Sequence, residues 1–264
     1  MPRLGMGTWH MGEERARRAQ EVRALQLGLD LGMDLIDTAE MYGGGGAEEV
    51  VGEAIRGRRD AVYVVSKFYP HHASKRDLPR ACEASLGRLG IERLDMYLLH
   101  WRGNVPLAET VEALERLVEQ GRIARWGVSN LDLRDMQQLV AAGGDRVACN
   151  QVLYHLDARG IEFDLLPWCG KHAVDVMAYC PLDQGKLPRH RVVLAQAKRL
   201  GIEPGQLAVA WLLGHGVVVI PKASREAHVR ANAACRDLRL DDACLAALDA
   251  AFPPPRAAQP LGVI

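Results

Sequence analysis

The chain has 264 residues, of which 48% are hydrophobic and 25% charged, which is typical of a soluble globular protein and fits one α/β barrel of roughly 250 residues. Thirty-three basic residues balance thirty-three acidic ones, so no global charge attracts nucleic acid or an anionic membrane. No apolar run approaches the roughly 18 residues of a membrane span and the N-terminus lacks a signal-peptide core, so we expect a cytoplasmic protein.

The first part of the chain alternates between amphipathic segments and short apolar runs. Segment 17–31 carries Val22, Leu25 and Leu29 at helical spacing. The run 33–37 is short and apolar, as in a buried strand. We therefore predict strands at 5–9, 33–37, 61–67 and 93–100, and helices at 17–31, 48–56 and 75–89.

The same alternation continues to the end of the chain. A helix at 107–120 stops at Gly121, where a C-terminal glycine is favoured. The remaining strands are predicted at 123–129, 147–151, 174–179 and 217–220, and the remaining helices at 131–142, 165–171, 192–200, 206–213, 225–234 and 241–251. Because apolar strands that are each followed by a helix pair in parallel, eight such units predict a (β/α)8 TIM barrel, as a single domain over residues 1–264.

Four ionisable side chains lie at or just after the predicted strand ends. Asp37 ends the second strand, Lys67 the third and His100 the fourth, while Tyr42 follows the second strand and precedes four glycines. Each has a structural explanation by itself, such as a salt bridge for Lys67 or a satisfied core histidine for His100. Since the C-terminal ends of barrel strands converge on one mouth, we expect all four to meet there.

Motifs along nearly the whole chain carry a resemblance to a known family. They are Gly7-Thr8-Trp9, Asp37-Thr38-Ala39 followed by Tyr42, Val65-Ser66-Lys67, Leu98-Leu99-His100-Trp101, Trp126-Gly127-Val128-Ser129-Asn130, Asn150-Gln151, Ala178-Tyr179-Cys180-Pro181-Leu182 and Ile220-Pro221-Lys222. In order and spacing the chain resembles the aldo-keto reductase superfamily, specifically its bacterial members. The resemblance implies an NADP-dependent oxidoreductase that reduces aldehydes or ketones to alcohols.

The resemblance implies a catalytic role for each of the four residues. Tyr42 would be the general acid that protonates the carbonyl oxygen. Tyrosine titrates near pH 10, and a neighbouring Lys67 ammonium is expected to lower the pKa of Tyr42. Asp37 would hold Lys67 charged and oriented, and His100 would hydrogen-bond the carbonyl oxygen.

NADPH is the cofactor that the resemblance implies, bound across the barrel mouth. Tyr179 would stack on the nicotinamide, and Ser129, Asn130 and Gln151 would hydrogen-bond its carboxamide. Lys222 and Ser224 would contact the 2′-phosphate, and Asn232 would contact the adenine. The other implied cofactor contacts are Thr8, Trp9, Pro181, Leu182 and His228. His228 stands where the family often has arginine, so the preference for NADP over NAD is less secure.

Six cysteines without CxxC spacing give no zinc site or redox pair, and no metal is expected.

Aromatic residues after three strands, namely Trp9, Tyr69 and Trp101, are the expected substrate-side residues. His71 and His72 are adjacent, and we expect their side chains to diverge in a solvated loop. The segment after Phe252 is shorter than the family's usual C-terminal loop, which implies an open pocket for small aldehydes, dicarbonyls or keto sugars. The family's default oligomeric state is the monomer.

Two other functions are compatible with a barrel of this kind. The first is an NADP(H)-binding sensor or partner subunit with little turnover, which the complete set of four catalytic residues disfavours. The second is a barrel enzyme that uses Lys67 as a Schiff-base nucleophile. A lysine paired with Asp37 stays protonated and is a poor nucleophile, so the reductase is the favoured hypothesis.

Overall fold

The computed structural model describes residues 1–264 and has one sheet of eight parallel strands in the order β1 to β8. The strands are β1 (Gly5–Gly7), β2 (Leu35–Asp37), β3 (Tyr63–Phe68), β4 (Leu94–Leu99), β5 (Ile123–Ser129), β6 (Cys149–Leu153), β7 (Asp175–Tyr179) and β8 (Val218–Val219). Consecutive strands pair in parallel, and a parallel bridge between Leu4 and Val219 brings the two edges of the sheet together. The predicted (β/α)8 barrel is therefore confirmed.

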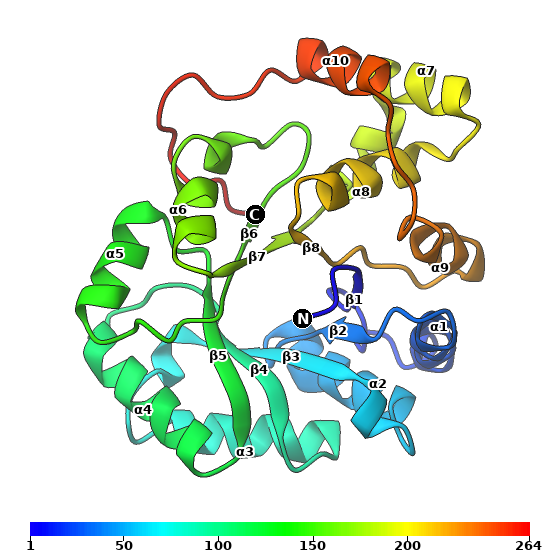
Figure 1. Cartoon of the computed structure of the whole chain (residues 1–264). Helices are drawn as coiled ribbons and strands as arrows, with labels where there is room; N and C mark the ends of the chain where they lie inside the picture. The colour runs from blue at the N-terminus through cyan, green and yellow to red at the C-terminus, as the bar shows by residue number, and fades with distance from the viewer.

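Helices form the outer ring of the barrel (Figure 1). They are α1 (Arg18–Asp30), α2 (Gly46–Ala54), α3 (Leu78–Leu89), α4 (Leu107–Glu119), α5 (Leu133–Ala141), α6 (Leu165–Lys171), α7 (Arg191–Leu200), α8 (Pro204–Gly214), α9 (Glu226–Ala233) and α10 (Asp242–Ala251). None of them combines the length and the apolar character needed to cross a membrane. The segment after α10 turns back toward the barrel (Figure 1), and the C-terminus lies near β6 and β7, where Gly262 is close to Leu153 and Ile264 lines the same cavity as Tyr179.

Every strand and helix predicted from the sequence is present, with ends that shift by a few residues. The first strand ends at Gly7 instead of Trp9, so Thr8 and Trp9 belong to the loop at the barrel mouth. The sixth strand runs over Cys149–Leu153 instead of 147–151, which places Gln151 within a strand and not at its end. The Gln151 side chain therefore projects from a strand, and it reaches Asp37 at the end of β2.

The strands of the barrel carry apolar side chains on both of their faces. The large core lies between strands and helices, and a smaller cluster fills the barrel itself: Leu35, Val65, Met96, Leu98, Cys149, Met177, Val218 and Ile220. Alternation along each strand sends successive side chains to opposite faces, which produces these two layers. Because these side chains fill most of the interior, the polar side chains of the barrel gather toward the C-terminal ends of the strands.

The glycine run after β2 shapes the loop that carries Tyr42. Gly43, Gly44 and Gly45 adopt left-handed φ values of 58°, 60° and 94°, which disfavour other residues. A Cβ on Gly46 would lie 2.5 Å from the carbonyl oxygen of Gly12. The loop after β2 thus packs closely against the loop after β1, and a larger residue at 46 would push the two apart.

Substitution of two helical glycines by alanine should have opposite effects on stability. In Gly52→Ala, the new Cβ on α2 would meet the Leu89 carbonyl oxygen of α3 at 2.4 Å, so we expect the free energy of unfolding to fall by about 1–3 kcal/mol. In Gly87→Ala, the Cβ on α3 enters open space, and we expect a gain of about 0.5–1 kcal/mol. Urea unfolding of both variants measures this, and equal changes would contradict the close packing of α2 on α3.

Candidate functional site

The four predicted catalytic residues come together at the C-terminal ends of β2, β3 and β4. Lys67 Nζ lies 2.8 Å from Asp37 Oδ2 and 3.0 Å from the Tyr42 hydroxyl oxygen. The His100 ring packs edge-on against the Tyr42 ring, with centroids 5.7 Å apart. Asp37 ends β2, Lys67 lies next to the end of β3, and His100 directly follows β4, so the strand ends set this arrangement.

Lys67 is fully buried, and its ammonium group is held by three acceptors. They are Asp37 Oδ2, the Thr38 carbonyl oxygen at 2.9 Å and the Tyr42 hydroxyl, which match the three N–H donors of the ammonium. Burial by itself would lower the pKa of Lys67, but the charge of Asp37 and the contacts with Tyr42 outweigh burial and raise it. Lys67 therefore carries its positive charge inside the site.

The pKa of Tyr42 differs in direction from the sequence-based expectation. Burial raises this pKa, and that effect exceeds the lowering caused by the charge of Lys67, while the charge of Asp37 raises it further. Lys67 lowers this pKa as predicted, but the net shift is upward, because the sequence reveals the neighbouring ammonium and not how deeply the phenol is buried. Tyr42 is consequently a protonated phenol at neutral pH.

Asp37 has a second partner that the sequence did not reveal. Gln151 on β6 donates from Nε2 to Asp37 Oδ1 at 2.7 Å, so both carboxylate oxygens are occupied. The Thr8 hydroxyl also donates to the Asp37 carbonyl oxygen at 2.9 Å. Asp37 is thus fixed from the loop after β1, from β3 and from β6, and no local sequence signal links it to a residue 114 positions away.

His100 is buried and electrically neutral at ordinary pH. Burial and then the positive charge of Lys67 lower the pKa of His100 to about 3. Its Nδ1 atom is buried without a hydrogen-bond partner. A neutral imidazole beside Tyr42 can donate one hydrogen bond to a bound group without releasing a proton to it.

A cavity of about 450 Å³ opens above these residues at the barrel mouth. Asp37, Tyr42 and His100 line it, whereas Lys67 lies beneath them. The predicted cofactor residues that line it are Thr8, Trp9, Ser129, Asn130, Gln151, Tyr179, Pro181, Leu182 and Lys222. Ser224, in the segment after β8, does not line it, and neither do His228 and Asn232 of α9.

Polar groups and one flat ring at the cavity floor suit an aromatic ring that bears a carboxamide. The half-buried Tyr179 donates from its hydroxyl to Asn130 Oδ1 at 2.8 Å, which fixes the face of the phenol ring. The Ser129 hydroxyl donates to the Gln151 carbonyl oxygen at 2.9 Å. The exposed Lys222 at another edge of the cavity supplies a positive charge suited to an anionic group.

The expected substrate-side residues divide into two groups. Trp9 lines the cavity, whereas Tyr69 and Trp101 do not. Trp101 packs against His100 with ring centroids 4.9 Å apart, and Tyr69 packs edge-on against Trp101 at 5.9 Å. Tyr69 and Trp101 therefore form an aromatic pair beside His100.

The loop after β3 makes side-chain contacts that the sequence analysis did not predict. The rings of His71 and His72 do not diverge, because their centroids are only 4.2 Å apart. His72 is also not simply solvated, since its Nδ1 lies 2.9 Å from Oε1 of the buried Glu40. The sequence offered no signal for this contact between two loops.

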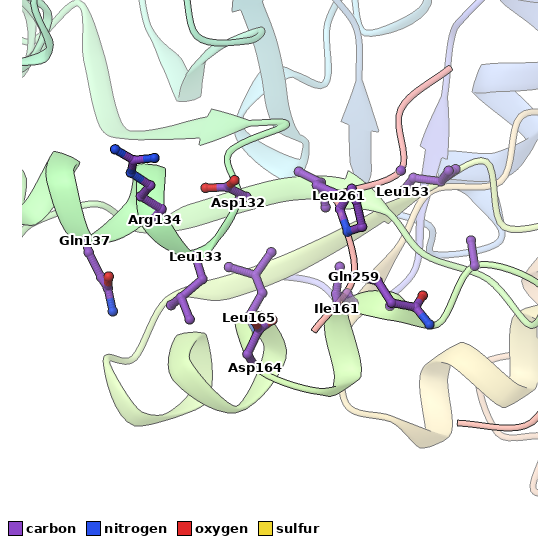
Figure 2. A pocket seen from close by; sticks show the side chains of 14 residues that line it. Asp132, Leu133, Arg134, Gln137, Leu153, Ile161, Asp164, Leu165, Gln259 and Leu261 are labelled. Carbon is purple, nitrogen blue, oxygen red and sulfur yellow. The ribbon is translucent and has the colours of Figure 1, made fainter. Parts of the chain in front are cut away.

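A second cavity, of about 360 Å³, lies between α5, α6 and the C-terminal segment (Figure 2). Its two carboxylates stabilise helix ends: Asp132 accepts from the Asp135 amide at 2.8 Å, and Asp164 accepts from the Leu165 amide at 2.6 Å. None of the predicted site residues lines this cavity. The strand-end cavity is therefore the candidate functional site.

The structure offers no cluster of three or more His, Cys, Asp or Glu side chains that could hold a metal ion. All six cysteines are free; five are buried, and only Cys180 is half-buried beside the cavity.

Comparisons with known proteins identify the family of the chain. A family model described as the aldo/keto reductase family matches residues 3–252. Methylglyoxal reductase YeaE of Escherichia coli (strain K12) is 51% identical, and the match covers 100% of this chain and 95% of that protein. The crystal structure of an aldo/keto reductase from Klebsiella pneumoniae in complex with NADP and acetate is 55% identical, with a TM-score of 0.98 over 100% of this chain and 96% of the other. The thermostable aldo-keto reductase Tm1743 in complex with epalrestat is 38% identical, with a TM-score of 0.88 over 95% of each chain.

The lowered pKa of His100 predicts that its imidazole does not change protonation state near neutral pH. We expect the His100 imidazole signal, followed by NMR, to stay that of the neutral ring between about pH 5 and pH 8, where an unperturbed histidine titrates. The neutral ring contributes folding stability above the unfolded-state pKa of about 6.5, and this contribution is lost as the pH falls toward 3. A His100 midpoint near 6.5 in the folded protein would contradict its burial beside the Lys67 charge.

Proposed function

The chain belongs to the aldo/keto reductase family and is an NADP-dependent oxidoreductase, and from this premise we propose that it reduces small aldehydes and dicarbonyls, such as methylglyoxal, to alcohols. The observation that carries the proposal is the buried contact of the Lys67 ammonium with both Asp37 and the Tyr42 hydroxyl. This contact sits under a cavity with room for a small carbonyl compound. The 51% identity to a methylglyoxal reductase supports the substrate class.

In the proposed mechanism, Tyr42 is the general acid. Bound NADPH supplies the hydride to the carbonyl carbon. Tyr42 donates its hydroxyl proton to the oxygen on which negative charge develops, and its raised pKa keeps that proton available at neutral pH. The Lys67 ammonium, 3.0 Å from the hydroxyl oxygen, stabilises the phenolate that Tyr42 becomes.

Asp37 and His100 have supporting roles in this mechanism. Asp37 balances the charge of Lys67 and, with Gln151 on its other oxygen, keeps the ammonium directed at Tyr42. His100 stays neutral, so it orients the carbonyl oxygen by donating a hydrogen bond and does not compete with Tyr42 as the acid.

The residues at the cavity floor would hold the nicotinamide end of NADPH. We assign Tyr179 to stack on the face of the nicotinamide ring, and Ser129, Asn130 and Gln151 to hydrogen-bond its carboxamide. The Gln151 Oε1 atom makes no hydrogen bond within the chain, so it can accept one from the carboxamide while Nε2 stays on Asp37. We assign Lys222 to the anionic part of the cofactor, with Ser224, His228 and Asn232 of the following segment beside it.

Tyr42→Phe tests the general acid. We expect turnover of methylglyoxal, followed by loss of reduced-nicotinamide absorbance, to fall about 10²–10⁴-fold, because only proton transfer is removed. NADPH binding should persist. Tyr63→Phe is a matched control that removes a buried hydroxyl without a partner and should leave turnover unchanged. Near-normal turnover in Tyr42→Phe would exclude Tyr42 as the acid.

Lys222→Ala tests the assignment of the anionic end of the cofactor. Loss of a hydrogen bond between charged groups should raise the dissociation constant for NADPH about 10–100-fold, measured by quenching of tryptophan fluorescence. The dissociation constant for NADH should change much less. Lys198→Ala, which removes an exposed lysine of α7, serves as the control. Equal effects on both cofactors would mean that another residue holds the 2′-phosphate.

A further inference from the structure

Glu40 is a buried carboxylate that the proposed mechanism does not use. It lies between Asp37 and Tyr42 in the loop after β2, and only 9% of its surface is exposed. Its backbone N–H donates to the carbonyl oxygen of Lys67 at 3.1 Å. Because a buried carboxylate is unfavourable without partners, its contacts indicate what it holds in place.

The side chain of Glu40 binds the loop after β3. Its Oε1 atom accepts the Tyr69 backbone N–H at 2.6 Å and lies 2.9 Å from His72 Nδ1. Hydrogen bonds to an ionised acceptor are stronger than those between neutral groups. One carboxylate oxygen therefore joins the loop that carries Tyr42 to the loop that carries Tyr69.

Tyr69 begins a row of ring contacts that leads to the catalytic residues. The Tyr69 ring packs edge-on against Trp101 at 5.9 Å, Trp101 packs against His100 at 4.9 Å, and His100 packs edge-on against Tyr42 at 5.7 Å. These separations are within the favourable range for aromatic pairs. A shift of Tyr69 would therefore be passed through Trp101 to His100, which lines the cavity.

The charge of Glu40 acts on Tyr69 and not on the proton donor. Burial and then the charge of Glu40 raise the pKa of Tyr69. The charges that act on the pKa of Tyr42 are those of Lys67 and Asp37. Glu40 is thus placed to affect the geometry of the site without changing the acidity of Tyr42.

We propose that Glu40 is a positioning residue that, through Tyr69 and Trp101, determines which carbonyl compounds fit beside His100. This inference rests on the proposed function, because it requires a carbonyl compound bound beside His100. Tyr69 and Trp101 do not line the cavity, but Trp101 packs on His100, which does. We therefore expect a bulky dicarbonyl such as phenylglyoxal to extend past His100 to the aromatic pair, whereas methylglyoxal needs only Tyr42 and His100. Dependence on Glu40 therefore increases with the size of the substrate.

Glu40→Ala and Glu40→Gln test the inference by steady-state kinetics with both dicarbonyls. In Glu40→Ala we expect the KM for phenylglyoxal to rise about 10-fold or more, while kcat/KM for methylglyoxal and the dissociation constant of NADPH change less than about 3-fold. Glu40→Gln keeps an acceptor oxygen for the Tyr69 N–H and should recover most of the loss. An equal loss on both substrates, or an unchanged KM for both, would overturn the proposal.

Hydrogen exchange of the Tyr69 amide gives a second measurement, which does not need turnover. We expect this amide to exchange about 10-fold or more faster in Glu40→Ala than in the wild type, with β5 unchanged. His71→Ala, which removes a ring stacked on Tyr69 without touching the carboxylate, is the control and should leave the exchange as it is. Unchanged protection in Glu40→Ala would refute the contact.

The two measurements separate failure of this inference from failure of the proposed function. If the wild type reduces neither dicarbonyl, the proposed function fails, yet the exchange rates still decide whether Glu40 positions Tyr69. If Glu40→Ala does not fold, His72→Ala takes its place, because it removes one of the two contacts of Glu40 Oε1. It should raise the KM for phenylglyoxal more than that for methylglyoxal, and the opposite order would overturn the proposal.

Discussion

The burial of one ammonium group constrains the rest of the site. Lys67 is fully buried, and a buried charge is tolerated only when it is paired and all its donors are satisfied. Its acceptors are the carboxylate of Asp37, the carbonyl oxygen of Thr38 and the hydroxyl of Tyr42. The end of β2 and the loop after it must therefore come within about 3 Å of a side chain on β3, which parallel pairing of these strands achieves.

One environment acts on three ionisable groups with different results. Removal from water disfavours the charged form of each group, so it raises the pKa of Tyr42 and lowers that of His100. For Lys67 the paired Asp37 outweighs the same effect, so the lysine stays charged. The site thus keeps a protonated phenol, a charged ammonium and a neutral imidazole together at one pH, which is the combination that carbonyl reduction through the proposed mechanism requires.

The loops at the barrel mouth are held by specific contacts and not only by the strands beneath them. The loop after β2 packs on the loop after β1 so closely that Gly46 leaves no room for a Cβ. Glu40 joins the same loop to the one after β3. The loop that carries Tyr42 therefore has neighbours on both sides, which limits how far its hydroxyl can move from Lys67.

The sequence by itself determined the strand and helix order, the barrel and the meeting of Asp37, Tyr42, Lys67 and His100. These follow from local periodicity and from the rule that the ends of parallel barrel strands share one mouth. Only the tertiary structure decided the direction of the Tyr42 pKa shift, the Gln151–Asp37 hydrogen bond and the contact of His72 with Glu40. Burial depth and contacts between distant segments depend on how the whole chain packs, and no local pattern of residues encodes them.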